Sequence, residues 1–139
     1  MAGAGEVFSW LVRMARVLRS EEGCPWDRAQ DEASLARCVL AEAQELHEAV
    51  ISHDSAHVCE EIGDVLFTLI SMAALAEERG DFSLLDMLNQ LEAKMVRRHP
   101  HVFGEENAST VEEALRHWNE VKRSEKTGRD STRANGDLK

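Results

Sequence analysis

Four carboxylates in this sequence stand at the spacing that brings acidic side chains together on paired helices. They form two pairs, Glu42 with Glu45 and Glu61 with Asp64, and the members of each pair are three residues apart. Residues three apart share a helix face. Glu45 and Glu61 are each eight residues from His53, and Glu42 and Asp64 are each eleven from it. If the chain turns near His53, an antiparallel hairpin brings all four carboxylates to one place.

Such a cluster indicates a bound cation. Leu35 and Val58 lie on the same stripes as the acids, so the carboxylates are expected to face the bundle interior. There they would repel one another and lose hydration unless a cation neutralised them. Ligation by oxygen alone favours a hard ion, so we expect Mg²⁺, with Mn²⁺ as a substitute. The alternative is an ordinary solvated helix face, which is common in acidic chains.

The histidines do not change this interpretation. A di-iron carboxylate bundle would use Glu-x-x-His pairs, and none of the six histidines has a glutamate three residues before it. We interpret His47 and His57, which lie near the acids, as ordinary polar positions rather than ligands. The expected centre is therefore built from carboxylates.

The elements that would position these acids are helices. Apolar residues recur at intervals of three and four, and they predict helices at about 6–19, 34–51, 56–79, 83–98 and 109–126. Gly80 is expected to end the second long helix, and Pro100 to interrupt the chain before the last one. Residues 23–27 are expected to form a loop. The fold class is therefore all-α, a helical bundle built on the antiparallel hairpin of the two long helices.

Composition narrows the functional class. The 139 residues fit one domain, expected at 1–126, with a disordered tail at 127–139. A net charge of −10 argues against binding a nucleic-acid polymer, which requires a basic face. The longest uncharged apolar run, 65–76, is too short to cross a membrane. Three widely spaced cysteines and the absence of a secretion-signal pattern predict reduced thiols and a cytoplasmic location.

An ordered series of motifs extends beyond the acids. It comprises Gly-Cys-Pro-Trp-Asp at 23–27, Leu-Ala-Glu-Ala-Gln-Glu-Leu at 40–46, Glu-Glu-Ile-Gly-Asp at 60–64 and Lys-Met-Val-Arg-Arg-His-Pro-His-Val-Phe-Gly at 94–104. This series resembles the MazG-type nucleoside triphosphate pyrophosphohydrolases of the all-α NTP pyrophosphatase group. The resemblance implies Mg²⁺-dependent hydrolysis of canonical or non-canonical (d)NTPs to the monophosphate and pyrophosphate, as nucleotide-pool house-cleaning. It also implies a homodimer or higher homo-oligomer, with dimerisation completing the bundle.

The resemblance assigns roles to particular residues. Its Glu-Glu-x-x-Glu and Glu-x-x-Asp patterns make the same four acids the metal ligands and catalytic residues. Nucleotide-binding roles are implied for Lys94, Arg98, Trp118, Lys122, Trp26 and Asp27. Each has a structural alternative. A cationic side chain near the C-terminus of a helix can stabilise the helix through its dipole, and a tryptophan can anchor a helix or loop.

The sequence departs from the family pattern at one position. Ala41 stands where the first glutamate is expected. Two alternatives to a broad pyrophosphohydrolase therefore stay open. One is a non-catalytic nucleotide-binding, metal-binding or dimerisation module with a degenerate site. The other is a related enzyme of narrow specificity, such as a dUTP or dCTP pyrophosphatase or a phosphoribosyl-ATP pyrophosphohydrolase.

Overall fold

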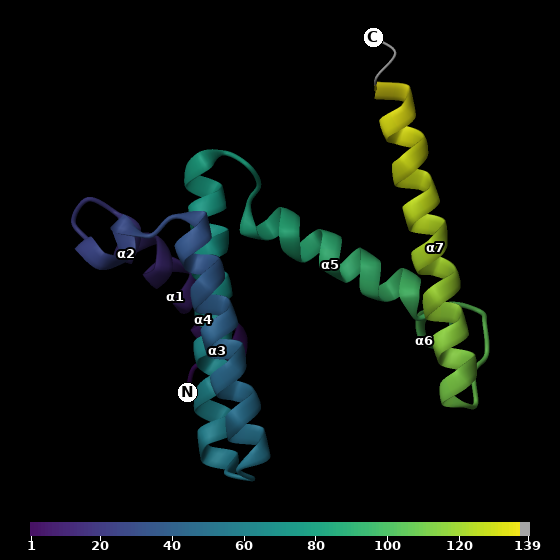
Figure 1. Ribbon diagram of the computed structural model, residues 1–139, viewed down its shortest axis with the longest axis horizontal. Coiled ribbons are helices and arrows are strands. Elements are labelled where there is room, and N and C mark those ends of the chain that lie inside the picture. Colours follow the sequence, from purple (N-terminus) through teal and green to yellow (C-terminus); the bar gives the residue numbers. More distant parts are fainter. Residues whose placement is uncertain (137–139) are drawn as a thin grey trace. The chain divides into compact units, whose positions relative to one another are not determined.

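The computed structural model describes residues 1–136, with side chains through 129, and every regular element among them is helical (Figure 1). The chain forms two compact units, Met1–Asp86 and a second that begins at Met87. The first unit holds α1 (Ala4–Arg19), α2 (Pro25–Ala29), α3 (Glu32–Ile51) and α4 (Ser55–Arg79). The second holds most of α5 (Leu84–Arg98), then α6 (Pro100–Phe103) and α7 (Val111–Gly136). The all-α prediction is confirmed.

The two long helices α3 and α4 form the predicted hairpin, and aspartates at their N-termini define where each begins. Asp31 caps α3 by accepting a hydrogen bond from the Ser34 backbone at 2.7 Å, and the Ser34 hydroxyl accepts one from the Asp31 backbone at 2.9 Å. Asp54 caps α4 by accepting hydrogen bonds from the backbone N–H groups of Ala56 and His57. The turn between the helices places His53 at φ 56°, and Gly80 ends α4 at φ 72°. Because Asp31 is the cap, α3 begins slightly earlier than the periodicity predicted.

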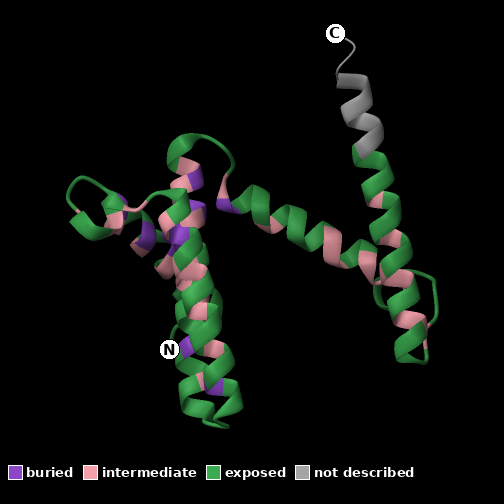
Figure 2. Cartoon of the chain, in the orientation of Figure 1, coloured by how far each residue is buried: buried purple, intermediate pink, exposed green. Residues whose placement is uncertain are grey.

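Helix α1 packs on α4, and α2 packs on α1. Figure 2 shows buried residues on α1, α3 and α4. The buried apolar side chains of the first unit are Val12, Ala15, Leu35, Ala49, Ile70, Ala73, Ala74, Ala76 and Leu84. Most of them are small, so the helices can approach closely, but the resulting core is thin. Among the described residues, no large side chain is completely buried.

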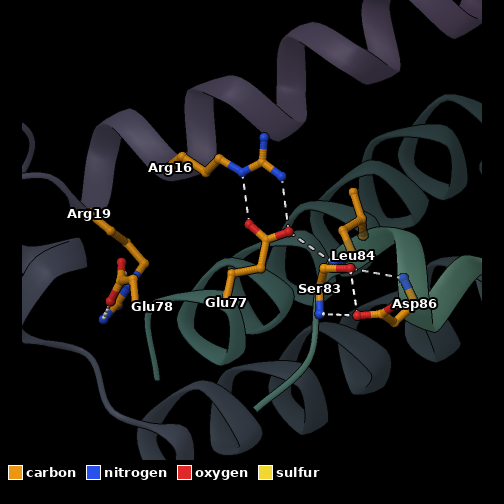
Figure 3. Close-up of polar contacts among 7 residues, drawn as sticks. All are labelled: Arg16, Arg19, Glu77, Glu78, Ser83, Leu84 and Asp86. Carbon is orange, nitrogen blue, oxygen red and sulfur yellow. Dashed lines mark hydrogen bonds and ion pairs between the residues drawn. The ribbon is translucent and has the colours of Figure 1, made fainter. Parts of the chain in front are cut away.

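Charged contacts connect α1 to the end of α4 (Figure 3). Arg16 pairs with Glu77, and the nearly buried Arg19 pairs with Glu78. Arg19 also donates to the backbone carbonyls of Asp27 and Gln30, where α2 ends. The Asp27 carbonyl also accepts the backbone N–H of Gln30 at 3.2 Å, so Arg19 adds to the hydrogen bonding at the end of this short helix and stabilises it. The loop predicted at 23–27 is correct only for its first two residues, because residues 25–29 form α2, with Pro25 at its first position.

In the second unit, α5 ends at Arg98 as predicted, and Pro100 begins the short helix α6. Helix α7 begins at Val111, where the Thr110 hydroxyl accepts a hydrogen bond from the Glu113 backbone at 3.2 Å. The helix therefore begins slightly later than residue 109, where it was predicted to start. Arg97 and Arg98 of α5 both pair with Glu125 of α7.

The expected disordered tail is largely helical in the structure. Helix α7 continues through Gly136, past its predicted end at Lys126. No proline interrupts residues 127–136, and glycine is the only strongly unfavourable helix residue among them, so nothing in this stretch forces the helix to stop. The remaining part of the predicted tail, 137–139, lies outside the described residues. None of the helices described combines the length and apolar character of a membrane span.

Candidate active site

Three of the four predicted carboxylates meet within the α3–α4 hairpin. Glu42 and Glu45 come from α3, and Glu61 comes from α4. One carboxylate oxygen from each lies within 4.8 Å of the other two, which is close enough for all three to hold a single ion. The spacing along the sequence therefore predicted the convergence of these side chains correctly.

The environment of the three carboxylates differs. Glu61 is buried, with 5% of its surface exposed, whereas Glu42 is half-buried and Glu45 is exposed. Oε2 of Glu42 and Oε2 of Glu61 are both buried without a hydrogen-bond partner. Burial raises the pKa of Glu42, and the charges of Glu45, Asp64 and Glu61 raise that pKa further.

This arrangement fits a divalent cation. A buried carboxylate oxygen without a partner is unfavourable, and a cation supplies the missing partner. The same ion would offset the repulsion that raises the pKa of Glu42. The donors are all carboxylate oxygens, which suits Mg²⁺ or Mn²⁺ better than a softer metal.

Asp64 lies outside the group of three, although sequence spacing predicted it as the fourth ligand. Its side chain is exposed on α4. The same spacing of three residues keeps Glu42 and Glu45 together on α3, so the exclusion of Asp64 depends on the rotation of α4 about its own axis. Asp64 still contributes to the raised pKa of Glu42, which places its charge near the cluster.

His57 makes a contact with Glu61 that sequence reasoning missed. Its Nε2 lies 2.9 Å from Oε1 of Glu61, one helical turn further along α4. The spacing of four residues, at which helix side chains are neighbours, was the available signal. This contact gives His57 a specific partner, and His57 lies outside the group of carboxylates that could hold an ion, in agreement with the interpretation that it is not a ligand.

The nucleotide-binding candidates from α5 and α7 lie in the second unit, where Arg98 and Trp118 are in contact. The Arg98 guanidinium carbon is 4.8 Å from the centre of the Trp118 ring, and Arg98 Nη2 is 2.9 Å from Oε2 of Glu125. The His99 ring approaches Trp118 edge-on, with centroids 5.3 Å apart. Trp118 therefore contacts protein groups as an anchor does, and its stacking role stays a prediction.

Lys94 is half-buried on α5, and Lys122 is exposed on α7. Lys122 lines a shallow, open hollow along α7, together with Asn119, Arg123, Lys126 and Arg129. This basic surface contrasts with the acidic character of the whole chain. Lys122 and its neighbours therefore present a surface suited to an anion.

The remaining two candidates, Trp26 and Asp27, belong to α2 in the first unit. Trp26 is 60% exposed, so its ring is accessible to a ligand. The backbone carbonyl of Asp27 accepts a hydrogen bond from Arg19 Nη1 at 2.7 Å. That bond fixes the backbone of α2 and leaves the Asp27 side chain available for other contacts.

Comparison with known proteins identifies the family of this chain. Residues 30–103 match the MazG nucleotide pyrophosphohydrolase domain. The nucleoside triphosphate pyrophosphohydrolase/pyrophosphatase MazG of Thermotoga maritima is 39% identical over 133 residues, which is 96% of this chain and 51% of that protein. The nucleoside triphosphate pyrophosphohydrolase of Escherichia coli K12 is 36% identical over 116 residues, covering 84% of this chain and 44% of that one.

Two further comparisons extend this result. The uncharacterized protein YabN of Bacillus subtilis is 38% identical over 125 residues, or 90% of this chain and 26% of that protein. The chain thus spans about a quarter to a half of these relatives. The crystal structure of a mazG-related protein from Thermotoga maritima matches with a TM-score of 0.70 and 32% identity, covering 83% of this chain and 98% of that one. The chain therefore belongs to the MazG nucleotide pyrophosphohydrolase family.

Proposed function

We propose that this chain hydrolyses nucleoside triphosphates to the monophosphate and pyrophosphate, including non-canonical nucleotides, with Mg²⁺ as cofactor. The observation that carries the proposal is the convergence of Glu42, Glu45 and Glu61, two of which have a buried oxygen without a partner. The names of the Thermotoga and Escherichia relatives as nucleoside triphosphate pyrophosphohydrolases support the reaction class.

The three carboxylates would hold the ion, with Asp64 as the proposed fourth ligand. When bound, Mg²⁺ would neutralise phosphate charge and the charge that develops at the reacting phosphorus. Glu42 and Glu61 are the more enclosed ligands, whereas Glu45 and Asp64 are exposed to water. Glu45 and Asp64 are therefore the carboxylates best placed to orient a water molecule or accept its proton.

The nucleotide itself would need further contacts. Lys94, Arg98 and Lys122 carry the positive charge that triphosphate oxygens require. Trp26 is exposed and presents a ring on which a base can stack. We also propose Asp27 and Trp118 as contacts to the nucleotide.

We propose a homodimer on the basis of the thin core and the apolar side chains left exposed. On the first unit, Trp10, Leu40, Ile51 and Ile62 are more than half exposed. We propose that these side chains contribute to a contact surface with a partner. A second copy is the natural partner, since most soluble oligomers contain identical chains. Sedimentation equilibrium measures this directly, and a monomer at micromolar concentration would contradict it.

The function is tested by measuring pyrophosphate and monophosphate release from a panel of canonical and modified NTPs and dNTPs. Parallel reactions contain Mg²⁺, Mn²⁺ or EDTA. We expect equal amounts of the two products, with Mg²⁺ or Mn²⁺ required. Release of inorganic phosphate, or equal rates with EDTA, would contradict the proposal.

Ala41 favours one second candidate, a module that binds nucleotide and metal without hydrolysis. The missing glutamate removes a carboxylate next to Glu42, where it could help to orient water. Calorimetric nucleotide binding in Mg²⁺, with no product from any substrate of the panel, would establish this candidate. Ala41→Glu would then be expected to create turnover.

A further inference from the structure

The two carboxylate oxygens of Glu61 have different surroundings. Oε1 lies 2.9 Å from Nε2 of His57, whereas Oε2 is buried and has no hydrogen-bond partner. The Glu61 side chain is almost completely enclosed, while that of His57 is 45% exposed. His57 therefore contacts a buried carboxylate from the edge of the hairpin and occupies only one of its oxygens.

We propose that His57 is a positioning residue that holds Glu61 in the orientation needed to bind the cation. When Glu61 is ionised, both of its oxygens can only accept hydrogen bonds, so Nε2 of His57 must carry the donated hydrogen. A hydrogen bond to Oε1 fixes the rotation of the carboxylate and leaves Oε2 available. This inference rests on the proposed function, because it concerns a ligand of the proposed metal site.

The position of His57 is itself well defined. It lies in the first turn of α4, and its backbone N–H donates to Oδ1 of the capping Asp54 at 3.2 Å. The imidazole then reaches the residue four positions later on the same helix face. The Asp54 cap fixes the start of α4 and with it the origin of the His57 side chain.

His57 acts on the site through Glu61 rather than as a ligand. Only carboxylates belong to the group of described side chains whose ligand atoms lie within 4.8 Å of one another. A hard cation also prefers oxygen to imidazole nitrogen. Partners that orient a ligand commonly change metal affinity by about 10–100-fold when they are removed.

The test is metal affinity in the absence of nucleotide, measured by titrating Mn²⁺ and following the electron paramagnetic resonance signal of the free ion. We expect His57→Ala to weaken Mn²⁺ binding by about tenfold. Alanine is the better helix former, so α4 is retained, which circular dichroism verifies. In turnover assays the KM for Mg²⁺ should rise, while kcat at saturating Mg²⁺ should change little.

Two further variants separate positioning from a general structural role. The side-chain nitrogen of glutamine stands as many bonds from Cβ as Nε2 of histidine and also donates, so His57→Gln should restore most of the affinity. His47→Ala, at an exposed histidine of α3, is the matched control and should bind Mn²⁺ like the wild type. Wild-type affinity in His57→Ala, or equal losses in His57→Ala and His57→Gln, would overturn the inference.

Glu61→Gln distinguishes failure of this inference from failure of the proposed metal site. If Glu61→Gln loses Mn²⁺ while His57→Ala keeps it, the metal site stands and only the role of His57 is wrong. If the wild type does not bind Mn²⁺, or Glu61→Gln binds it unchanged, the metal site itself is wrong, and the inference is overturned with it.

Discussion

Arg16 of α1 and Glu77 of α4 form a two-point ion pair, with Nε and Nη2 of the arginine 2.8 and 2.9 Å from the two carboxylate oxygens (Figure 3). The same carboxylate accepts a hydrogen bond from the backbone N–H of Leu84 at 2.9 Å. Glu77 therefore connects α1 to α4 and satisfies an unpaired backbone group at the start of α5.

This contact predicts an acid-dependent loss of stability. The hydrogen bonds from Arg16 and Leu84 hold the pKa of Glu77 below its ordinary value. A carboxylate with a lowered pKa stabilises the fold at pH values above the pKa that it has in the unfolded chain, near 4.3. This stabilisation is lost as the pH falls through the lower pKa that the carboxylate has in the folded protein. We expect Glu77→Gln to lower the free energy of unfolding by about 1 kcal/mol at pH 7, after allowance for solvent exposure of the pair.

The difference between Glu77→Gln and wild type should shrink as the pH falls below 4, as followed by urea denaturation. The exposed Glu92 of α5 provides the control, and Glu92→Gln should leave stability unchanged at both ends of the range. A deficit in Glu77→Gln that stays constant with pH would show that packing, rather than the ion pair, supplies the stabilisation.

Gly23 is predicted to tolerate no side chain. The chain folds back over the end of α1, where the N–H of Cys24 bonds the Leu18 carbonyl at 2.8 Å. A Cβ at position 23 would overlap the carbonyl oxygens of Val17 and Leu18, and backbone cannot move aside easily. Gly23→Ala should cost about 2 kcal/mol of stability. Gly5→Ala, where nothing lies within 4 Å, is the control, and equal stability of the two variants would contradict this account.

The hairpin could be predicted from sequence because its signals are local and agree with one another. Periodic apolar residues, the short polar turn and Gly80 all indicate the same two helices. Helix α2 could not be predicted this way, since Arg19 satisfies its final carbonyls from a different helix. The end of α7 was missed because its polar sequence neither requires nor forbids a helix.

The candidate site, too, could be predicted from the sequence only in part. Spacing located Glu42, Glu45 and Glu61, because residues on matched helix faces must meet across a hairpin. The same spacing could not show that Asp64 lies outside the group, because that depends on the rotation of α4 about its axis. The contact of His57 with Glu61 was visible as a spacing, but its importance depends on the burial of Glu61, which only the packed structure shows.

Turnover should depend on Glu61 and Asp64, the two proposed ligands from α4. Removing a residue that orients a metal ligand commonly lowers metal affinity or activity by about 10–100-fold, and removing the ligand itself should lower activity at least as much. We therefore expect Glu61→Gln and Asp64→Asn each to reduce kcat by about 100-fold or more. Circular dichroism should show unchanged helical content in both variants. Glu60→Gln, at the exposed neighbour of Glu61, is the control and should keep full activity. Retained turnover in both test variants would remove these residues from the catalytic site.

The clustered charges should destabilise the protein when no cation is present. Glu42 is half-buried beside two other carboxylates, so Glu42→Gln removes both a desolvation penalty and a repulsion. In EDTA we expect the melting temperature to rise by about 3 °C. Added Mg²⁺ should stabilise the wild type and have little effect on the variant. The control is Glu48→Gln, at an exposed position of α3, which should melt at the same temperature as the wild type. A lower melting temperature for Glu42→Gln in EDTA would contradict the argument from repulsion.

Glu125 tests whether the arginines of α5 bind substrate. Its carboxylate accepts hydrogen bonds from Arg97 and Arg98, which lower the pKa of Glu125, so it competes with any phosphate for the same donors. If Arg98 contacts the triphosphate, Glu125→Gln should lower the KM for nucleotide by about threefold at low salt and change kcat little. Glu120→Gln, at an exposed position of the same helix, is the control. An unchanged KM in Glu125→Gln would show that neutralising the shared partner of Arg97 and Arg98 leaves substrate binding unaffected. The two arginines would then serve to connect α5 to α7.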